Sequence, residues 1–261
     1  MLTRQLDSID LLKFCCFLIF AGNGIALLTG TSALAYIFQN STEIEVVFGI
    51  LLIAFSATLL PSASSIREVN FQYFLLLPTA ILFVTTCASF VKSGYVPEQI
   101  IEHGIKLLAP IVLFWCLTSK RINLDNLMLV LKVLIAITFI GHGMFAFGLH
   151  YVPGGFIEMT TVILGIPISN AYVFLQVIGV LDIVCAILIF FNFNVKFAYV
   201  YLIFWGLTTA AARLAYGVLI NEGSLTELLY WTSNMLYRLP YGFIAILVFQ
   251  HSIKKQRLSR I

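Results

Sequence analysis

Four residues with chemically capable side chains stand within apolar stretches of the second half of the chain, namely His142, Asp182, Arg213 and Arg238. A histidine transfers protons near neutral pH or orients a ligand. An arginine presents a planar set of donors that suits an anion or a carbonyl oxygen. These residue types favour a pocket for a small anion or for the head group of a quinone. Their candidate neighbours in that pocket are Thr209, Trp231 and Tyr237.

Two ion pairs are expected among the ionisable residues. A charged group inside a bilayer costs about 2.5–3.5 kcal/mol on insertion scales, so such groups face the interior of a bundle and pair. Counting residues from the ends of the predicted helices places Asp182 and Arg238 at similar depths, and we predict a pair between them. Glu102 precedes Lys106 by four residues, which suits a pair within one helix. Alternatively, these polar residues only lock the packing of the helices.

Other kinds of site find little support. The five cysteines lie in apolar runs and none forms a CxxC motif, so neither a metal site nor a redox pair is predicted. The net charge is only +3 and no basic patch is interleaved with aromatic residues, so no nucleic-acid partner is expected. The sequence identifies no cofactor with certainty, and a quinone is the one that the predicted pocket would suit.

The elements that position these residues are predicted to be membrane-spanning helices. Apolar residues make up 61% of the chain and charged residues 10%, whereas soluble domains are near one half and one quarter. The excess of apolar side chains must face lipid. A spanning helix needs about 20 mostly apolar residues. Runs of this kind predict an all-α integral membrane protein of about eight transmembrane helices, at 9–28, 44–62, 71–91, 102–118, 127–147, 171–191, 197–218 and 229–250.

An internal duplication is indicated by matches that occur in the same order in both halves. The tripeptide Gly22-Asn23-Gly24 follows Lys13 at the spacing at which Gly141-His142-Gly143 follows Lys132. Further matches place Gly49 on Gly179 and Lys106 on Arg238. Four helices per unit is an even number, so the two units have the same orientation and form a parallel repeat. We therefore predict two four-helix bundles, 1–122 and 123–261.

The two predicted units differ in polar content. In the first unit Asn23, Leu52 and Phe90 stand at the positions of His142, Asp182 and Arg213. The pocket is therefore expected in the second unit, and the first is expected to be a scaffold or a surface for partner proteins. A short helix over the pocket is predicted between 152 and 168, which is too long for a plain turn.

The orientation follows from lysine and arginine in the short loops, which favour the cytoplasmic side. The loops at 29–43 and 148–170 contain neither residue. Both termini are therefore expected to be cytoplasmic in a cell inner (plasma) membrane, with the pocket facing outward. The basic set at the cytoplasmic ends is Arg4, Lys13, Arg67, Lys120, Arg121, Lys196, Lys254, Lys255, Arg257 and Arg260.

The second half resembles the DoxX-like family of four-helix membrane proteins. The resemblance rests on Gly141-His142-Gly143, Pro153, Gly179-Val180-Leu181-Asp182, Arg213, Trp231 and Arg238-Leu239-Pro240. It covers about half of the chain directly and the rest through the repeat. It implies an accessory or redox-linked inner-membrane subunit, because members are linked to quinone-coupled sulfur oxidation or to redox-associated complexes.

Two other functions stay open. The chain could be a purely structural subunit of a larger membrane complex, in which the polar set only fixes packing. It could also be a small-solute transporter that uses the two similar halves. Against transport, no predicted span is interrupted at corresponding places in the two halves, which is the usual mark of a transporter.

Overall fold

The computed structural model describes residues 2–30, 33–39, 41–60, 71–119, 121–191 and 195–258, and it is helical without a strand throughout these ranges. Among the basic residues used above for orientation, Arg67, Lys120 and Arg260 lie outside the described residues, as do the side chains of Arg4 and Arg257. The expectation of an all-helical protein is confirmed.

Within the described ranges, six helical stretches are long and apolar enough to cross a membrane. They are Ser8–Leu28 in α1 (Leu2–Leu28), α2 (Ser41–Thr58), Gln72–Lys92 across α3 (Phe71–Phe74) and α4 (Leu76–Lys92), α7 (Leu124–Phe147), α9 (Ile168–Leu188) and Lys196–Ile220 in α10 (Val195–Ile220). Six of the predicted spans therefore coincide with such helices.

The other two predicted spans lie next to or across a break in the helix. The span at 102–118 is the 15-residue α6 (Gly104–Thr118), preceded by the single turn α5 (Glu98–Ile101). The span at 229–250 is divided into α11 (Leu225–Leu236) and α12 (Leu239–Leu258). The expectation that no span is broken in both halves is therefore wrong.

Each interruption has an identifiable cause, one of them local and the other a contact with a neighbouring helix. Pro240 has no backbone N–H to donate to the carbonyl of Leu236, and its ring would clash with that carbonyl in a continuous helix. At the other junction, the N–H of Ile105 donates to the hydroxyl of Thr138 on α7 at 2.8 Å instead of to the carbonyl four residues earlier. The chain thus bends at Tyr237–Arg238 and at Glu102–His103.

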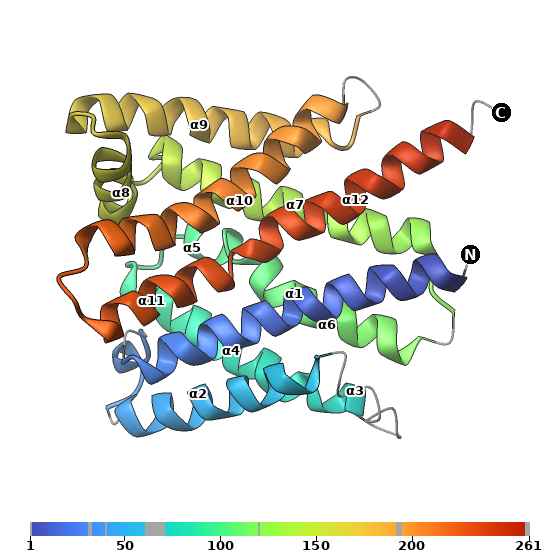
Figure 1. Cartoon of the computed structure of the whole chain (residues 1–261), viewed down its shortest axis with the longest axis horizontal. Coiled ribbons are helices and arrows are strands. Elements are labelled where there is room, and N and C mark those ends of the chain that lie inside the picture. Colours follow the sequence, from blue (N-terminus) through green and yellow to red (C-terminus); the bar gives the residue numbers. More distant parts are fainter. Residues whose placement is uncertain are drawn as a thin grey trace.

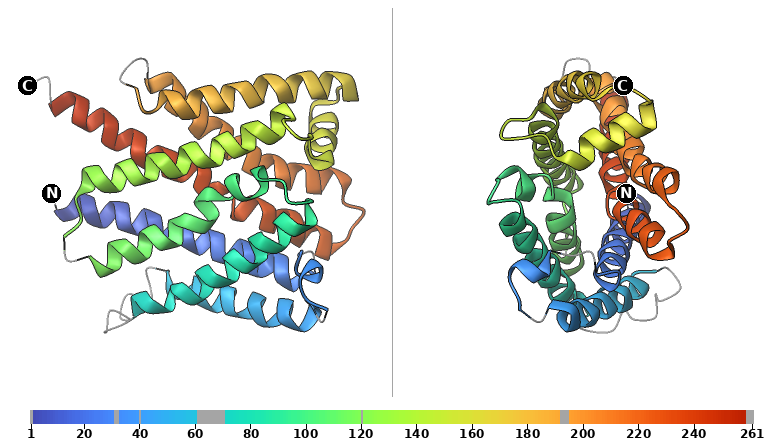
Figure 2. Two further views of the ribbon diagram at one scale, coloured as in Figure 1. Left: turned by 180° about the vertical axis from the view of Figure 1, so that it is seen from behind. Right: turned by 90° about the vertical axis from the view of Figure 1, so that its left-hand side faces the viewer.

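The long helices run along one axis of the molecule, and both termini lie at the same end of the bundle (Figures 1 and 2). The short helix α8 (Gly154–Leu164) lies across this axis at the opposite end and packs on α9 and α10. It occupies the segment for which a short helix is predicted. A single 3-10 turn, η1 (Leu34–Tyr36), packs on α2 and α4.

Pairs of glycines bring two pairs of helices into close contact. A Cβ atom on Gly24 of α1 would lie 3.0 Å from the carbonyl oxygen of Gly49 on α2. A Cβ atom on Gly143 of α7 would lie 2.7 Å from the carbonyl oxygen of Gly179 on α9. Small residues let membrane helices approach at backbone distance.

Two further glycines contact the interrupted helices. Gly22 of α1 lies against the backbone of Ser233 and Tyr237, where a Cβ would be 2.8 Å from the Ser233 carbonyl oxygen. Gly141 of α7 lies against the backbone nitrogen of Glu102. In this way α1 packs on α11 and α12, and α7 packs on α5 and α6. The two interruptions are thereby held at the centre of the bundle.

The outer surface of the bundle is apolar. Val173, Val177, Phe197 and Phe204 are more than half exposed along α9 and α10. Such a surface fits lipid far better than water.

Candidate functional site

A cavity of about 420 Å³ lies where the two interrupted helices meet. Its walls come from both halves of the chain: α1, α4 and the α5–α6 junction on one side, and α7, α8, α10 and α11 on the other. Lys92, Tyr151 and Gly155 are the exposed residues at its mouth, whereas Glu102 and Arg238 are buried at its floor. The mouth therefore lies at the end of the bundle opposite the termini.

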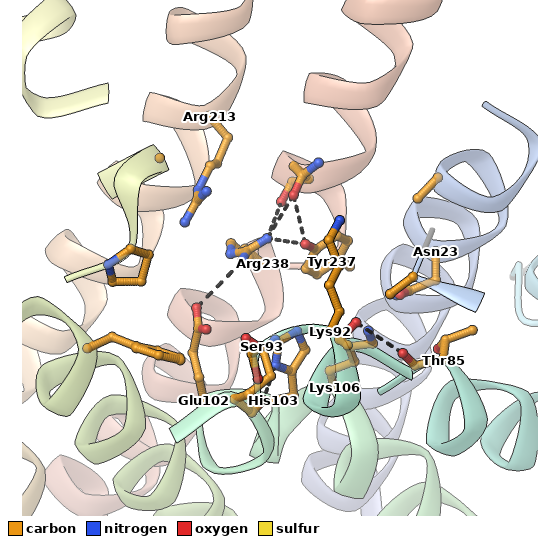
Figure 3. A pocket seen from close by; sticks show the side chains of 18 of the residues that line it. Asn23, Thr85, Lys92, Ser93, Glu102, His103, Lys106, Arg213, Tyr237 and Arg238 are labelled. Atoms are coloured by element: carbon orange, nitrogen blue, oxygen red, sulfur yellow. Dashed lines mark hydrogen bonds and ion pairs between the residues drawn. The ribbon is translucent and has the colours of Figure 1, made fainter. Parts of the chain in front are cut away.

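Arg238 is the most heavily connected residue of the pocket (Figure 3). Its Nη2 lies 3.5 Å from Oε1 of Glu102, across the two interruptions. Its Nη1 donates to Oδ1 of Asn234 at 3.1 Å and to the hydroxyl of Tyr237, whose ring also lies under the guanidinium. Its Nε has no hydrogen-bond partner among the described residues, although Arg238 is only 7% exposed. The guanidinium thus keeps one buried donor free.

Lys106 and Arg213 supply two more buried or half-buried cations. Lys106 is only 5% exposed, and its ammonium lies 5.4 Å from the centre of the Tyr237 ring. The Arg213 guanidinium lies 5.2 Å from the centre of the Phe156 ring, and in the part of the chain that the structure describes its Nε has no hydrogen-bond partner. Neither cation makes an ion pair with a residue that the structure describes.

The pocket carries a surplus of positive charge. Four cationic side chains line it, and Glu102 is the one carboxylate among the described lining residues. His103 also lines it, with Nδ1 2.7 Å from the Gln99 carbonyl oxygen, so that Nδ1 donates and Nε2 is left for other partners. The cations are Lys92, Lys106, Arg213 and Arg238.

A second polar cluster lies beside the pocket. Asp182 is fully buried on α9 and accepts a hydrogen bond from the hydroxyl of Tyr201 at 2.8 Å. Its other oxygen lies 2.7 Å from Nδ1 of His142. The His142 ring packs on Phe156, whose ring also contacts Arg213. The Phe156 side chain therefore links this cluster to the wall of the pocket.

Both predicted ion pairs are wrong. Asp182 pairs with His142 and not with Arg238, while Glu102 pairs with Arg238 and not with Lys106. The first prediction rested on depth along the membrane axis, which does not say which helices are neighbours. The second assumed one continuous helix, but the helix is broken at Glu102–His103. α9 packs on α7 and α10, whereas the Arg238 junction faces the α5–α6 junction of the other half.

The seven candidate pocket residues take three different places. Arg213, Tyr237 and Arg238 line the cavity, and His142 and Asp182 form the adjoining cluster. Thr209 donates to the Trp205 carbonyl of its own helix at 2.9 Å, and Trp231 packs on Tyr216. Neither of these two lines the cavity.

The expectation of a pocket confined to the second half is also corrected. The first half supplies Lys92, Glu102, His103 and Lys106 to the lining. Sequence reasoning noticed Glu102 and Lys106 but paired them within one helix. It missed Tyr201 entirely, since a tyrosine in an apolar span carries no signal beyond an ordinary lipid or core position. In the sequence, two adjacent polar residues followed by a glycine, Glu102-His103-Gly104, were the feature that could have indicated an interrupted helix.

Comparison with known proteins gives no relative: neither family models, nor curated proteins, nor solved structures match this chain. No three histidine, cysteine, aspartate or glutamate side chains lie close enough to share a metal ion in the described part of the chain.

Proposed function

We propose that the protein is a multi-pass membrane protein that binds a small anion in the pocket between its two halves. The surplus of buried positive charge carries this proposal. Lys106 and Arg238 are at least nine-tenths buried, Arg213 is close by, and Glu102 alone opposes them. Cations taken out of water are costly unless an opposite charge compensates them. An anion with acceptor oxygens would supply that charge and the missing partners of the two arginine Nε groups.

We further propose that the chain consists of two parallel four-helix units, 1–122 and 123–261. In each half the first helix packs on the second through paired glycines, Gly24 with Gly49 and Gly143 with Gly179. In each half the first helix also packs on the interrupted helix of the other half. Equivalent contacts between equivalent helices are what a duplicated unit would produce.

A DoxX-like inner-membrane protein with both termini in the cytoplasm stays our proposal for family and location. The glycines of Gly141-His142-Gly143 and Gly179 support it, because they hold α7 and α9 together around the His142–Asp182 pair. Arg121 lies in the connection from α6 to α7, and Lys254 and Lys255 lie in the last turns of α12, so these basic residues belong to the end that carries the termini and support the orientation. The mouth of the pocket would then face outward.

A quinone is the second candidate ligand, and it would make the protein a redox-linked subunit. Phe145, Tyr151, Phe156 and Tyr237 supply aromatic surface around the cations. A quinone head group could stack on these rings and accept hydrogen bonds from an arginine at its carbonyl oxygens. The uncompensated charge nevertheless favours the anion.

Binding to the protein purified in mild detergent tests the proposal. We expect sulfate, phosphate or benzenesulfonate to raise the melting temperature and to give a heat of binding by calorimetry. Arg238→Gln removes a charged donor, so affinity should fall about tenfold to a hundredfold. Arg121→Gln removes the same charge from an exposed position far from the pocket and should leave affinity unchanged.

Three results would argue otherwise. Binding of decylubiquinone without any anion would favour the redox-linked subunit. Stable copurification with other membrane proteins, with no ligand bound, would favour a purely structural subunit. Equal anion affinity in the wild type and in Arg238→Gln would contradict a role for the pocket.

A further inference from the structure

The pocket does not only hold its ligand: we propose that it is a transport site, through which the anion passes between the two interrupted helices. This inference rests on the proposed anion binding and adds a movement to it. The contact between Glu102 and Arg238 would be the gate that the anion opens.

The floor of the pocket is built from the two interruptions. Glu102 follows α5 and Arg238 precedes α12, and their side chains meet at 3.5 Å. Tyr241 adds a second contact across the same boundary, since its hydroxyl donates to the Glu102 carbonyl oxygen at 3.3 Å. Many transporters build their substrate sites from interrupted helices at the boundary between two repeats. Here one interrupted helix comes from each half of the chain.

The site is open to one side and closed to the other. Exposed Lys92 and Tyr151 stand at the mouth. Beyond the floor, α6 and α12 continue toward the end that carries the termini (Figure 1). On that course Leu113 of α6 and Ile244 and Val248 of α12 are buried in the apolar core. A site with access from one side only is one of the two states that alternating access requires.

The gate is a weak contact that an anion can replace. A separation of 3.5 Å exceeds the 2.7–3.2 Å of a good N–H···O hydrogen bond. An anion at the floor would compete with Glu102 for the guanidinium of Arg238, whose Nε is also free. Lys106 lines the same pocket, so the displaced carboxylate would still have a cation available there. Binding would thus remove the ionic contact between the two halves.

The surfaces beside the gate permit a shift of one half against the other. Gly22 lies against the backbone at Ser233 and Tyr237, and Gly141 lies against the backbone at Glu102. Because glycine has no side chain, nothing at these two positions interlocks with the interrupted helix. Both interruptions could therefore tilt about flat contacts while the packed helix pairs stay together.

Flux measurements in proteoliposomes test this inference. The probes are radiolabelled sulfate and benzenesulfonate, which stay charged and cross a lipid bilayer slowly. For the wild type we expect net uptake and, with unlabelled anion on the far side, exchange, both well above protein-free vesicles. Arg238→Gln should lose both by about tenfold or more.

Glu102→Gln separates gating from binding. The glutamine leaves no carboxylate to compete for Arg238, so anion affinity should rise. Without the ionic contact, the floor of the empty pocket would close less readily, which slows the return of the protein without its ligand. Net uptake needs that return and should fall by about tenfold, whereas exchange does not need it and should persist. Glu98→Gln is the matched control, since Glu98 is an equally buried glutamate one turn away that pairs with His150 outside the pocket. Its fluxes should equal those of the wild type.

The outcomes distinguish the two proposals. Wild-type protein that binds sulfate or benzenesulfonate but gives neither net uptake nor exchange overturns transport and leaves anion binding in place. Protein that neither binds nor transports these anions overturns both. Equal loss of net uptake and exchange in Glu102→Gln overturns the gate. Should Glu102→Gln fail to assemble, Tyr241→Phe removes the second contact across the floor and should lower net uptake more than exchange.

Discussion

At the scale of single residues, the buried polar groups fall into two sets with different demands. Arg238 and its neighbours keep donors without partners, whereas Asp182 has both oxygens occupied by His142 and Tyr201. A satisfied buried carboxylate stabilises the helices that it joins, here α7, α9 and α10. An unsatisfied buried cation is instead a place where a ligand can bind. The first set is therefore functional in our proposal and the second is structural.

This division predicts the effect of Asp182→Ala. The change leaves His142 and Tyr201 without their acceptor inside the bundle, so stability should fall by about 3 kcal/mol. Anion affinity of the folded fraction should stay within about twofold of the wild type, because Asp182 does not line the pocket. Thermal unfolding in detergent and calorimetry measure the two effects.

The control for this change is Asp10→Ala, since Asp10 is exposed and pairs only with Lys13 among the described residues. An exposed ion pair is worth about 1 kcal/mol or less. Loss of anion binding in folded Asp182→Ala would show that the His142–Asp182 cluster takes part in the site.

At the scale of the elements, the interrupted helices create the pocket. If each of these two helices were continuous, the side chains at 102 and 238 would lie along the surface of their own helix. The backbone N–H and C=O groups would then be hydrogen-bonded within each helix. The bends instead place Glu102 and Arg238 opposite each other. Glycines on α1 and α7 are needed because a larger residue would push the bends apart.

Gly141→Ala tests this packing. Its new methyl group would overlap the backbone of Glu102, which cannot move as a flexible side chain would. Overpacking of this kind costs about 1–3 kcal/mol, and we expect a lower melting temperature together with weaker anion binding. Gly154→Ala is the matched change, because nothing lies within 4 Å of a Cβ there. Equal melting temperatures for both variants would contradict the close contact.

Pro240→Ala tests the interruption itself. Alanine restores the N–H donor to the carbonyl of Leu236 and removes the clash, so α11 and α12 should approach one continuous helix. Thermal stability should be kept or should rise, while anion affinity falls at least tenfold because Arg238 turns away from the pocket. Unchanged affinity would mean that the bend is set by tertiary contacts and not by the proline.

At the scale of the whole molecule, the pocket belongs to neither half alone. Lys106 and Glu102 come from the first half, and Arg213 and Arg238 from the second. The loss of polar residues from the first half, which is plain in the sequence, therefore does not make that half a scaffold. Each half contributes an interrupted helix to a shared site.

Expression of the two halves as separate chains tests this view. We expect 1–122 and 123–261 to bind no anion when each is expressed alone, because each lacks part of the charge surplus. Expressed together, they should assemble through the contacts of α1 with α11 and of α7 with α5, and binding should return. Anion binding by 123–261 alone would instead support a pocket within the second half.

The amino-acid sequence alone indicates a helical membrane protein, the positions of six of its long helices and several of the polar residues buried among them. Transfer of side chains into lipid adds up residue by residue, so apolar runs of sufficient length can be recognised without knowing their neighbours. The glycines that bring helices together were also visible, since their spacing recurs from Gly22 to Gly141. What could not be recognised was the partner of each buried charge.

The partner of each buried charge depends on which helices adjoin and on which way each side chain points around its helix, and both are set by the packing of the bundle. Asp182 and Arg238 share a depth but face different neighbours, so their predicted pair does not form. The bend at Glu102 likewise depends on the hydroxyl of Thr138 on α7, a contact made only in the packed bundle. A pocket built from two halves of a chain is a property of their packing, and the charges that meet there have no common signature along the sequence.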